Sequence, residues 1–229
     1  IRETARRGRL PIITGGTGLY INALVENIQF NRFPDLLPEE IAELEDYARE
    51  KGAEALYEIL RNEDPEAALQ IHFNNIKRVV RAIGMKRRTG MTLAERNRVS
   101  RSQSPEVDCT VYALEMDRGL LYERINRRVD QMLRAGFADE VRNVIKICEN
   151  AYTLGETQQK SLGKTALQAI GYKEMIACFN GEYDFETAVE RIKQSTRHYA
   201  KRQITWFRKP AWVNWIGLED LRCIKRPEE

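Results

Sequence analysis

The spacing of apolar residues predicts that the chain begins with a strand, a turn and a helix. The apolar run Leu10–Thr14 (LPIIT) has the length of a buried strand, and a turn containing Gly15, Gly16 and Gly18 follows it. From Leu19 onward, apolar residues recur at helical spacing. A strand, a turn and a helix in this order are typical of α/β layer architectures.

The middle of the chain, from Pro38 to about Arg101, has the helical period throughout. Apolar residues recur at intervals of three and four, which predicts consecutive helices and no strand. Asp64 is an expected N-cap, because Pro65 follows it at the first helical position.

Strand signals return after this stretch. Two strands are predicted, Cys109–Met116 (CTVYALEM) and Trp212–Ile216 (WVNWI), the latter ending at Gly217. Between them we expect helices over about Arg118–Ala135, Ala138–Glu149, Leu167–Phe179 and Phe185–Arg208, and a polar loop at 150–165. The predicted fold class is α/β: residues 1–27 and 106–229 form the core, and residues 28–105 form an all-helical insertion.

The net charge of +3 conceals a strong segregation of charge. Residues 35–66 contain twelve Asp and Glu against three Lys and Arg, whereas residues 76–101 contain nine Lys and Arg against one Glu. Residues 187–210 contain seven Lys and Arg, again against one Glu. Two separate basic blocks indicate a polyanionic partner, with nucleic acid as the first candidate. The alternative is a pair of solvated helix faces.

Several classes of protein are disfavoured by composition. The four cysteines, Cys109, Cys148, Cys178 and Cys223, are scattered, and only two histidines are present. We therefore expect no zinc site, and a reducing, cytoplasmic location. No apolar run approaches the roughly 20 residues of a membrane span, and the polar, basic N-terminal residues are unlike a signal peptide.

Two short patterns indicate anion binding. The turn around Gly15 and Gly16 has no bulky side chains and offers the Thr17 hydroxyl at a helix N-terminus, where backbone N–H groups favour anions. Arg124 and Arg128 lie four residues apart on one helix face and can clamp a phosphate. The alternatives are a tight turn that binds nothing, and arginines paired with neighbouring carboxylates.

The helix expected at 189–208 has a basic stripe and an apolar stripe. Lys193, Arg197 and Lys201 follow at intervals of four, and Thr196 lies at the border of the stripe, where it can reach bases or phosphates. The apolar stripe, which we expect to face the core, contains Val189, Ile192, Tyr199 and Trp206. The alternative is an amphipathic surface helix without a ligand.

Six segments together resemble the bacterial tRNA dimethylallyltransferases. These are IITGGTGLYINAL, IHFNNIKRVVRAI, the TG of RRTGMTLAE, RINRRVDQMLRAGFADEV, QAIGYKEM and STRHYAKRQITWFR, in the order of that family and over about residues 8–217. The resemblance implies a P-loop-kinase-like three-layer core with a helical insertion that holds the anticodon stem. It also implies transfer of a dimethylallyl group from its diphosphate, with Mg²⁺, to N6 of the adenosine 3′ to the anticodon of tRNAs that read codons starting with U. The base is flipped out into a channel through the core.

Carried over by position, the resemblance implies that Thr17 lies near the adenine and that Arg128 holds the departing pyrophosphate. Gly15, Gly16 and Arg124 would line the same channel. The tRNA-contacting residues implied are Lys77, Arg78, Arg81, Gln168, Gln194, Thr196, Arg197 and Lys201. No residue of this chain is implied as a metal ligand, and we expect a monomer without membrane association.

The family pattern also includes an N-terminal P-loop, GPTxxGKT, and a DSxQxY segment with the implied base, neither of which occurs in this sequence. We therefore expect the chain alone to lack transfer activity. An enzyme that prenylates free adenylate would not need the basic block at 76–101, and a nucleotide kinase would not carry the TRHYAKRQITWFR helix. A non-catalytic RNA-binding fragment stays open as an alternative.

Overall fold

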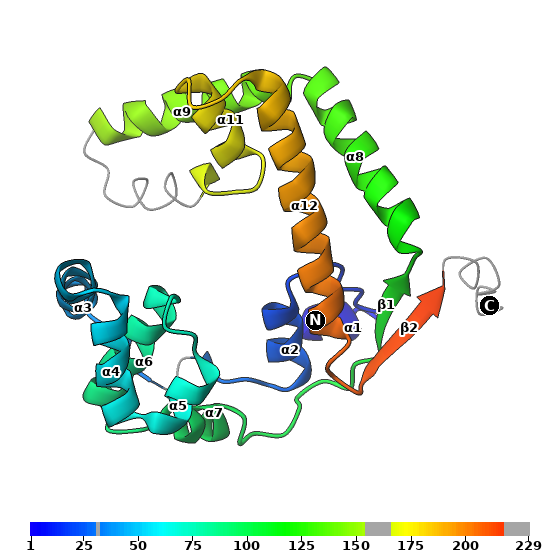
Figure 1. The fold of residues 1–229 in the computed structure, drawn as a ribbon. Coiled ribbons are helices and arrows are strands. Elements are labelled where there is room, and N and C mark those ends of the chain that lie inside the picture. The colour runs from blue at the N-terminus through cyan, green and yellow to red at the C-terminus, as the bar shows by residue number, and fades with distance from the viewer. Residues whose placement is uncertain (31–32, 154–165, 218–229) are drawn as a thin grey trace. The chain divides into compact units, whose positions relative to one another are not determined.

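The computed structural model describes residues 1–30, 33–153 and 166–217 (Figure 1). The chain consists of two compact units. The first unit is Ile1–Cys109 and the second is Thr110–Glu229. Over the described part of the chain, no helix combines the length and apolar character needed to cross a membrane.

The first unit contains seven helices among its described residues. They are α1 (Arg2–Arg6), α2 (Gly18–Val25), α3 (Pro38–Lys51), α4 (Ala53–Glu63), α5 (Pro65–Gln70), α6 (Ile76–Thr89) and α7 (Leu93–Ser100). The prediction of consecutive helices without a strand between Pro38 and Arg101 is confirmed. The apolar positions of α3 to α6 form one core, in which Leu56, Leu60 and Ile83 are completely buried. Each such side chain stabilises the fold by about 1.5–3 kcal/mol.

Asp64 is the N-cap of α5, as the sequence predicts. Its Oδ1 accepts a hydrogen bond from the Ala67 amide at 3.1 Å, and its Oδ2 accepts one from the Leu93 amide at 2.7 Å. The second bond links α5 to the start of α7, which explains why a carboxylate can be completely buried here. The cap therefore also supports tertiary packing.

The strand predicted over Leu10–Thr14 is wrong. The structure has no secondary structure between α1 and α2, and Leu10 and Ile12 are 82% and 78% exposed. A strand is stabilised by backbone hydrogen bonds to a neighbour, and no described segment pairs with this one. The glycine turn and the helix that follows it, α2, are present as predicted.

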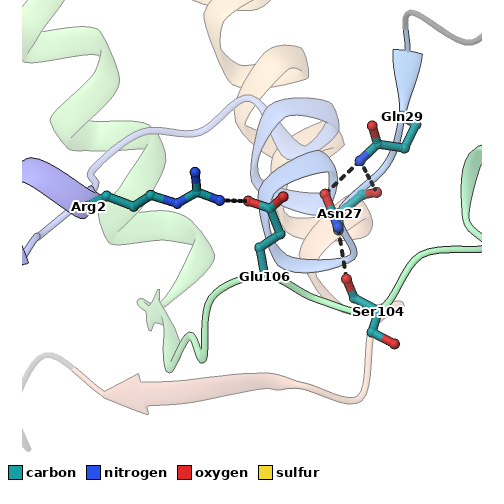
Figure 2. A network of polar contacts seen from close by, with 5 residues as sticks. All are labelled: Arg2, Asn27, Gln29, Ser104 and Glu106. Atoms are coloured by element: carbon teal, nitrogen blue, oxygen red, sulfur yellow. Dashed lines mark hydrogen bonds and ion pairs between the residues drawn. The ribbon is translucent and has the colours of Figure 1, made fainter.

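Polar contacts join the two ends of the helical stretch (Figure 2). The Asn27 side chain donates to the Ser104 carbonyl at 2.8 Å, and the Gln29 side chain donates to Asn27 Oδ1 at 2.7 Å. Further along, Arg2 forms an ion pair with Glu106 at 2.7 Å. The segments that enter and leave the stretch thus lie side by side, as an insertion requires. The domain limits 1–27, 28–105 and 106–229 stay a prediction.

The second unit contains the two predicted strands, β1 (Val111–Glu115) and β2 (Val213–Gly217). They pair in parallel, with Val111 opposite Val213 and Glu115 opposite Gly217. Between them lie α8 (Arg118–Arg134), α9 (Phe137–Thr153), α11 (Tyr172–Phe179) and α12 (Phe185–Phe207). The α9 helix extends four residues into the predicted loop at 150–165, and the remainder of that loop, like Cys223, lies outside the described residues.

The helix predicted from Leu167 starts later, at Tyr172. Gly171 has a φ of +97°, a left-handed conformation that interrupts helical hydrogen bonding. A Cβ at this position would also lie 2.8 Å from Phe137 Cζ, so the turn packs directly on the start of α9. Gln168 therefore lies in a turn before α11 and is exposed.

The core of the second unit lies where α8, α9, α11 and α12 meet. Its buried members are Val129, Phe137, Val141, Met175, Ala188 and Ile192. Of the predicted apolar stripe on α12, Ile192 is buried and Val189 packs against this core, but Tyr199 and Trp206 are each 38% exposed. The expectation that the whole stripe faces the core is wrong, because among the described residues the apolar cluster reaches no further along α12 than Ile192.

Candidate functional site

Thr17 is the N-cap residue of α2, at the end of the glycine turn. Its carbonyl accepts from the Tyr20 amide at 3.0 Å, whereas its hydroxyl makes no capping bond. No described atom lies within 4 Å of the place where a Cβ on Gly15 would be, and Gly16 is half-buried. The turn therefore offers an open approach and an exposed hydroxyl, as its composition predicts.

Arg124 and Arg128 project from α8 and are exposed. The carboxylates that the sequence offered as their partners are bound elsewhere: Glu123 pairs with Arg127 at 2.7 Å, and Asp130 pairs with Lys193 at 2.7 Å. No described residue makes an ion pair or a hydrogen bond with the Arg124 or Arg128 side chain. Two unpaired guanidinium groups four residues apart form a site that suits a phosphate or diphosphate.

The basic block on α6 separates into two groups. Lys77, Arg78 and Arg81, in the first half of the helix, are exposed and have no acidic partner among the described residues. In the second half, Arg87 binds Glu63 through Nε and Nη2, at 3.0 and 2.8 Å, and Arg88 binds Glu40 at 3.0 Å. The Glu63 carboxylate raises the pKa of Arg87. The pKa of Glu40 is lowered mainly by the hydrogen bond from the Leu37 amide and to a smaller extent by Arg88. The first group is free to bind an anion, whereas the second holds the helices together.

Arg96 on α7 is a buried cation that sequence reasoning did not single out. Its side chain lies beside the Asp64 carboxylate, and its Nε and Nη2 atoms have no hydrogen-bond partner among the described residues. Burial lowers the pKa of Arg96, Asp64 raises it, and the nearby charge of Arg81 lowers it further. Arg81 thus lies near a second, buried positive charge, which the Asp64 carboxylate partly compensates.

The basic stripe of α12 is largely occupied by contacts to α8 and within the helix. Lys193 pairs with Asp130, and Arg197 donates to Asn126 Oδ1 at 2.7 Å and to Glu190 Oε1 at 2.8 Å. The Thr196 hydroxyl donates to the Ile192 carbonyl at 2.7 Å.

Lys201 and Gln194 are exposed, so these two of the predicted tRNA contacts on α12 are directly accessible. Beyond them the helix borders an open hollow of about 460 Å³ lined by His198, Lys201, Arg202, Thr205, Trp206 and Lys209. The guanidinium of Arg202 lies 5.6 Å from the centre of the Tyr199 ring. Cations beside exposed aromatic rings are a combination found in surfaces that bind single-stranded nucleic acid.

Glu174 and Ser195 are the polar groups that the sequence pattern did not reveal. Glu174 is only 5% exposed, and its carboxylate accepts hydrogen bonds from the Gly171 amide and from the Ser195 hydroxyl, each at 2.8 Å. The only sequence signal is the position of Glu174 three residues after Gly171, the spacing of a carboxylate that caps the start of a helix.

The predicted site residues thus fall into separate groups. Lys77, Arg78 and Arg81 share one helix, and Arg124 and Arg128 share another. Thr17 and Arg128 belong to different units, so their common channel stays a prediction. Among the described residues, no group of three or more His, Cys, Asp or Glu side chains is arranged to hold a metal ion. The donor set therefore does not fit a protein-held Mg²⁺ in this part of the chain.

Comparison with known proteins places these features in one family. The chain belongs to the IPP transferase family, whose model matches residues 1–210. Two relatives, both named tRNA dimethylallyltransferase, come from Caldanaerobacter subterraneus subsp. tengcongensis and Acetivibrio thermocellus. Both are 40% identical to this chain; the alignments cover 100% and 96% of the chain, and 70% and 66% of the relatives' lengths.

Solved structures give the same result. The full-length tRNA isopentenylpyrophosphate transferase from Bacillus halodurans is 38% identical, with a TM-score of 0.53, over 94% of this chain and 62% of its own. A eukaryotic dimethylallyltransferase acting on tRNA is 26% identical, with a TM-score of 0.65, over 96% of this chain and 54% of its own. The chain thus spans between about half and two thirds of these solved chains.

Proposed function

We propose that the protein transfers a dimethylallyl group from dimethylallyl diphosphate to N6 of the adenosine 3′ to the anticodon in tRNAs that read codons starting with U. The observation that carries the proposal is the presence of two separate sets of exposed cations that have no carboxylate partner within residues 1–30, 33–153 and 166–217, three on α6 and two on α8. The α6 set suits the phosphodiester backbone of an RNA stem, and the α8 set suits a diphosphate. The shared family with named tRNA dimethylallyltransferases supports both assignments.

The proposed reaction sets defined tasks for these side chains. The N6 amine forms a bond to the allylic carbon, the carbon–oxygen bond to the diphosphate breaks, and the diphosphate leaves with the electron pair. N6 transfers one proton to a base, which in the family pattern is the aspartate of the DSxQxY segment and is not a residue of this chain. Arg128 and Arg124 stabilise the charge that develops on the leaving group. Thr17 orients the flipped adenine through its free hydroxyl. Mg²⁺ bound to the diphosphate would add positive charge, but the described residues supply no ligand set and no step is assigned to it.

The same proposal includes the finer architecture. The two parallel strands and the helices around them would be part of a P-loop-kinase-like three-layer core, and the α3–α7 helices its insertion. The protein would act as a monomer in the cytoplasm, where tRNA is modified.

The test is product formation by the full-length protein, that is, this chain joined to a segment that carries the GPTxxGKT and DSxQxY motifs of the family, because the chain alone is expected to lack transfer activity. Purified protein is incubated with dimethylallyl diphosphate and an anticodon stem-loop RNA, and N6-dimethylallyladenosine is measured by mass spectrometry of the digested RNA. An RNA with guanine in place of the target adenine is the negative control. Prenylated product from free adenylate instead of RNA would contradict the proposal, and tight RNA binding without any product would identify a non-catalytic RNA-binding protein.

Arg128→Ala tests the leaving-group role against a matched control, Arg127→Ala. Arg127 immediately precedes Arg128 on the same helix but is paired with Glu123. We expect Arg128→Ala to lower kcat and kcat/KM for the donor by on the order of 10²-fold, with RNA affinity unchanged. Arg127→Ala should change neither. Weaker RNA binding by Arg128→Ala with normal donor kinetics would place Arg128 on the RNA surface instead.

Thr17→Ala tests the other end of the proposed channel. We expect a lower rate of transfer at saturating donor, because the flipped base is misplaced, with little change in the KM for the donor. A rise in the donor KM alone would show that Thr17 binds the diphosphate.

A further inference from the structure

One buried carboxylate, Glu174, connects two segments of the second unit. Its Oε2 accepts from the amide of Gly171, in the turn before α11, and its Oε1 accepts from the hydroxyl of Ser195, on α12, both at 2.8 Å. The ammonium group of Lys173 lies 3.7 Å from Oε1 and supplies a compensating charge. Because a buried carboxylate is costly without such partners, this connection is specific and rigid.

Each connected segment carries an exposed amide side chain. Gln168 lies three residues before Gly171 in the same turn, and Gln194 immediately precedes Ser195 on α12. The turn itself needs restraint, since Gly171 has a φ of +97° and lies against the Phe137 ring. The carboxylate of Glu174 therefore fixes the segment of Gln168 relative to the segment of Gln194.

Glu174, Ser195 and Gln194 also border one hollow of about 480 Å³ between α11 and α12. Its other lining residues are Lys173, Ala177, Glu182, Tyr183 and Arg191. The lining combines two cations and two carboxylates with hydroxyls and an amide. Donors and acceptors of this kind suit the polar edge of a nucleobase better than a phosphate. The hydroxyl of Tyr183, which also lines the hollow, donates to the backbone carbonyl of Glu174 at 2.9 Å. Glu174 therefore positions Tyr183 as well.

We propose that Glu174 is a positioning residue that holds Gln168 and Gln194 in fixed geometry, so that this face of the second unit distinguishes the sequence of a bound RNA loop. The proposal rests on the proposed function, because it takes the anticodon loop as the ligand. Phosphate contacts such as those expected of α6 place an RNA without reading its sequence, whereas amide side chains read base edges only if their positions are fixed. Glu174 should therefore control loop discrimination and leave the electrostatic part of binding unchanged.

The experiment measures dissociation constants of the full-length protein for two fluorescein-labelled RNAs over a series of salt concentrations. One RNA is an anticodon stem-loop with the target adenine, and the other has the same stem with a scrambled loop. For Glu174→Ala we expect about a tenfold loss of discrimination between the two loops, the order of the discrimination that one base-edge contact provides. The slope of log Kd against log salt concentration should equal that of the unmodified protein.

Two further variants separate positioning from charge and from stability. Glu174→Gln should retain discrimination, because the amide oxygen can accept from the Gly171 amide and the amide nitrogen can donate to the Ser195 hydroxyl. Glu186→Ala, which removes an exposed carboxylate from the first turn of α12 outside this hollow, should also retain it. Ser195→Ala removes only the bond to α12 and should lose part of the discrimination; it provides the test if Glu174→Ala does not fold.

The outcomes distinguish this inference from the proposed function. Full discrimination by Glu174→Ala, or by Ser195→Ala where Glu174→Ala is unfolded, would overturn the inference while the proposed function stands. Equal losses in Glu174→Gln and Glu174→Ala would also overturn it, because charge and not geometry would then be responsible. An unmodified protein that binds neither RNA would overturn the proposed function itself.

Discussion

Replacing Lys77, Arg78 and Arg81 together by Ala should reduce the salt dependence of RNA binding by the full-length protein. The three side chains are exposed at the start of α6 and have no acidic partner among the described residues, so each is available to neutralise a phosphate. Each lost phosphate contact lowers the slope of log K against log salt concentration by about 0.7–0.9, or about 2.1–2.7 for three contacts. Over a fourfold change in salt concentration, this slope difference corresponds to a factor of roughly 20–40 in relative affinity.

The matched control lies on the same helix. Arg87→Ala with Arg88→Ala removes two cations that are already bound to Glu63 and Glu40, and that therefore release few counterions when RNA binds. The measurement is a fluorescence anisotropy titration with an anticodon stem-loop at several salt concentrations. For this control, the slope of log K against log salt concentration should equal that of the unmodified protein. The triple variant removes three positive charges and the control removes two. The main difference between them is whether the removed cations are paired with carboxylates.

Two results would refute the reasoning. If the triple variant keeps the slope of the unmodified protein, Lys77, Arg78 and Arg81 form only a solvated face. If the control variant loses as much slope as the triple variant, net charge alone decides binding, and the division of α6 into paired and unpaired cations has no functional meaning.

Two further predictions concern the stability of the second unit. Gly171→Ala should destabilise the fold by at least about 1 kcal/mol, because alanine at this position has both a left-handed φ and a Cβ too close to Phe137. Gly136→Ala is the control: its φ is +95°, but no described atom lies within 4 Å of its Cβ, so it should be less destabilising. Thermal unfolding followed by circular dichroism compares the two, and equal losses would show that the contact with Phe137 is unimportant. A hydrogen bond from the Thr187 amide lowers the pKa of the Asp184 carboxyl below its ordinary value of 3.8. The stability that this N-cap provides is therefore present above pH 3.8, and it is lost as the pH falls through the lowered pKa. Asp184→Asn keeps the cap without a titrating group, so its melting temperature should fall less steeply below pH 3.8, and parallel curves for the two proteins would contradict this assignment.

The helical period was sufficient to predict most of the fold. Helices with one apolar face, such as those between Pro38 and Arg101, are identified by spacing alone, and Asp64 before Pro65 identified a cap that the structure contains. The strand prediction for Leu10–Thr14 is wrong because a strand depends on a partner, and a short, mainly apolar run carries no information about one. The late start of α11 escaped prediction because the conformation of Gly171 is imposed by packing.

The division of cations into paired and unpaired groups was beyond the reach of sequence reasoning. Helical spacing shows which charges share a face, but the partner of Arg87 is Glu63, 24 residues away on another helix. Asp130, a near neighbour of Arg128 in sequence, instead binds Lys193 on α12. Only the tertiary structure shows that Arg128 has no partner in the part of the chain that the structure describes, and this is the property that makes it a candidate ligand for the diphosphate.

The parallel pairing of β1 with β2 has a consequence for the order in which the chain folds during synthesis. Val111 meets Val213, so the pairing closes a loop of about one hundred residues. The α3–α6 core is instead built from helices that all lie between Pro38 and Thr89. The length-dependent entropy of closing such a loop costs about 4 kcal/mol, and contacts so distant in sequence form slowly. On the ribosome the helical stretch can pack as soon as it emerges. The β1 strand, with Tyr112 and Leu114 exposed even in the folded unit, must wait for β2 and for helices made later. A polypeptide released before residue 213 would therefore carry an unpaired apolar strand edge, the feature that quality-control chaperones bind and that promotes aggregation.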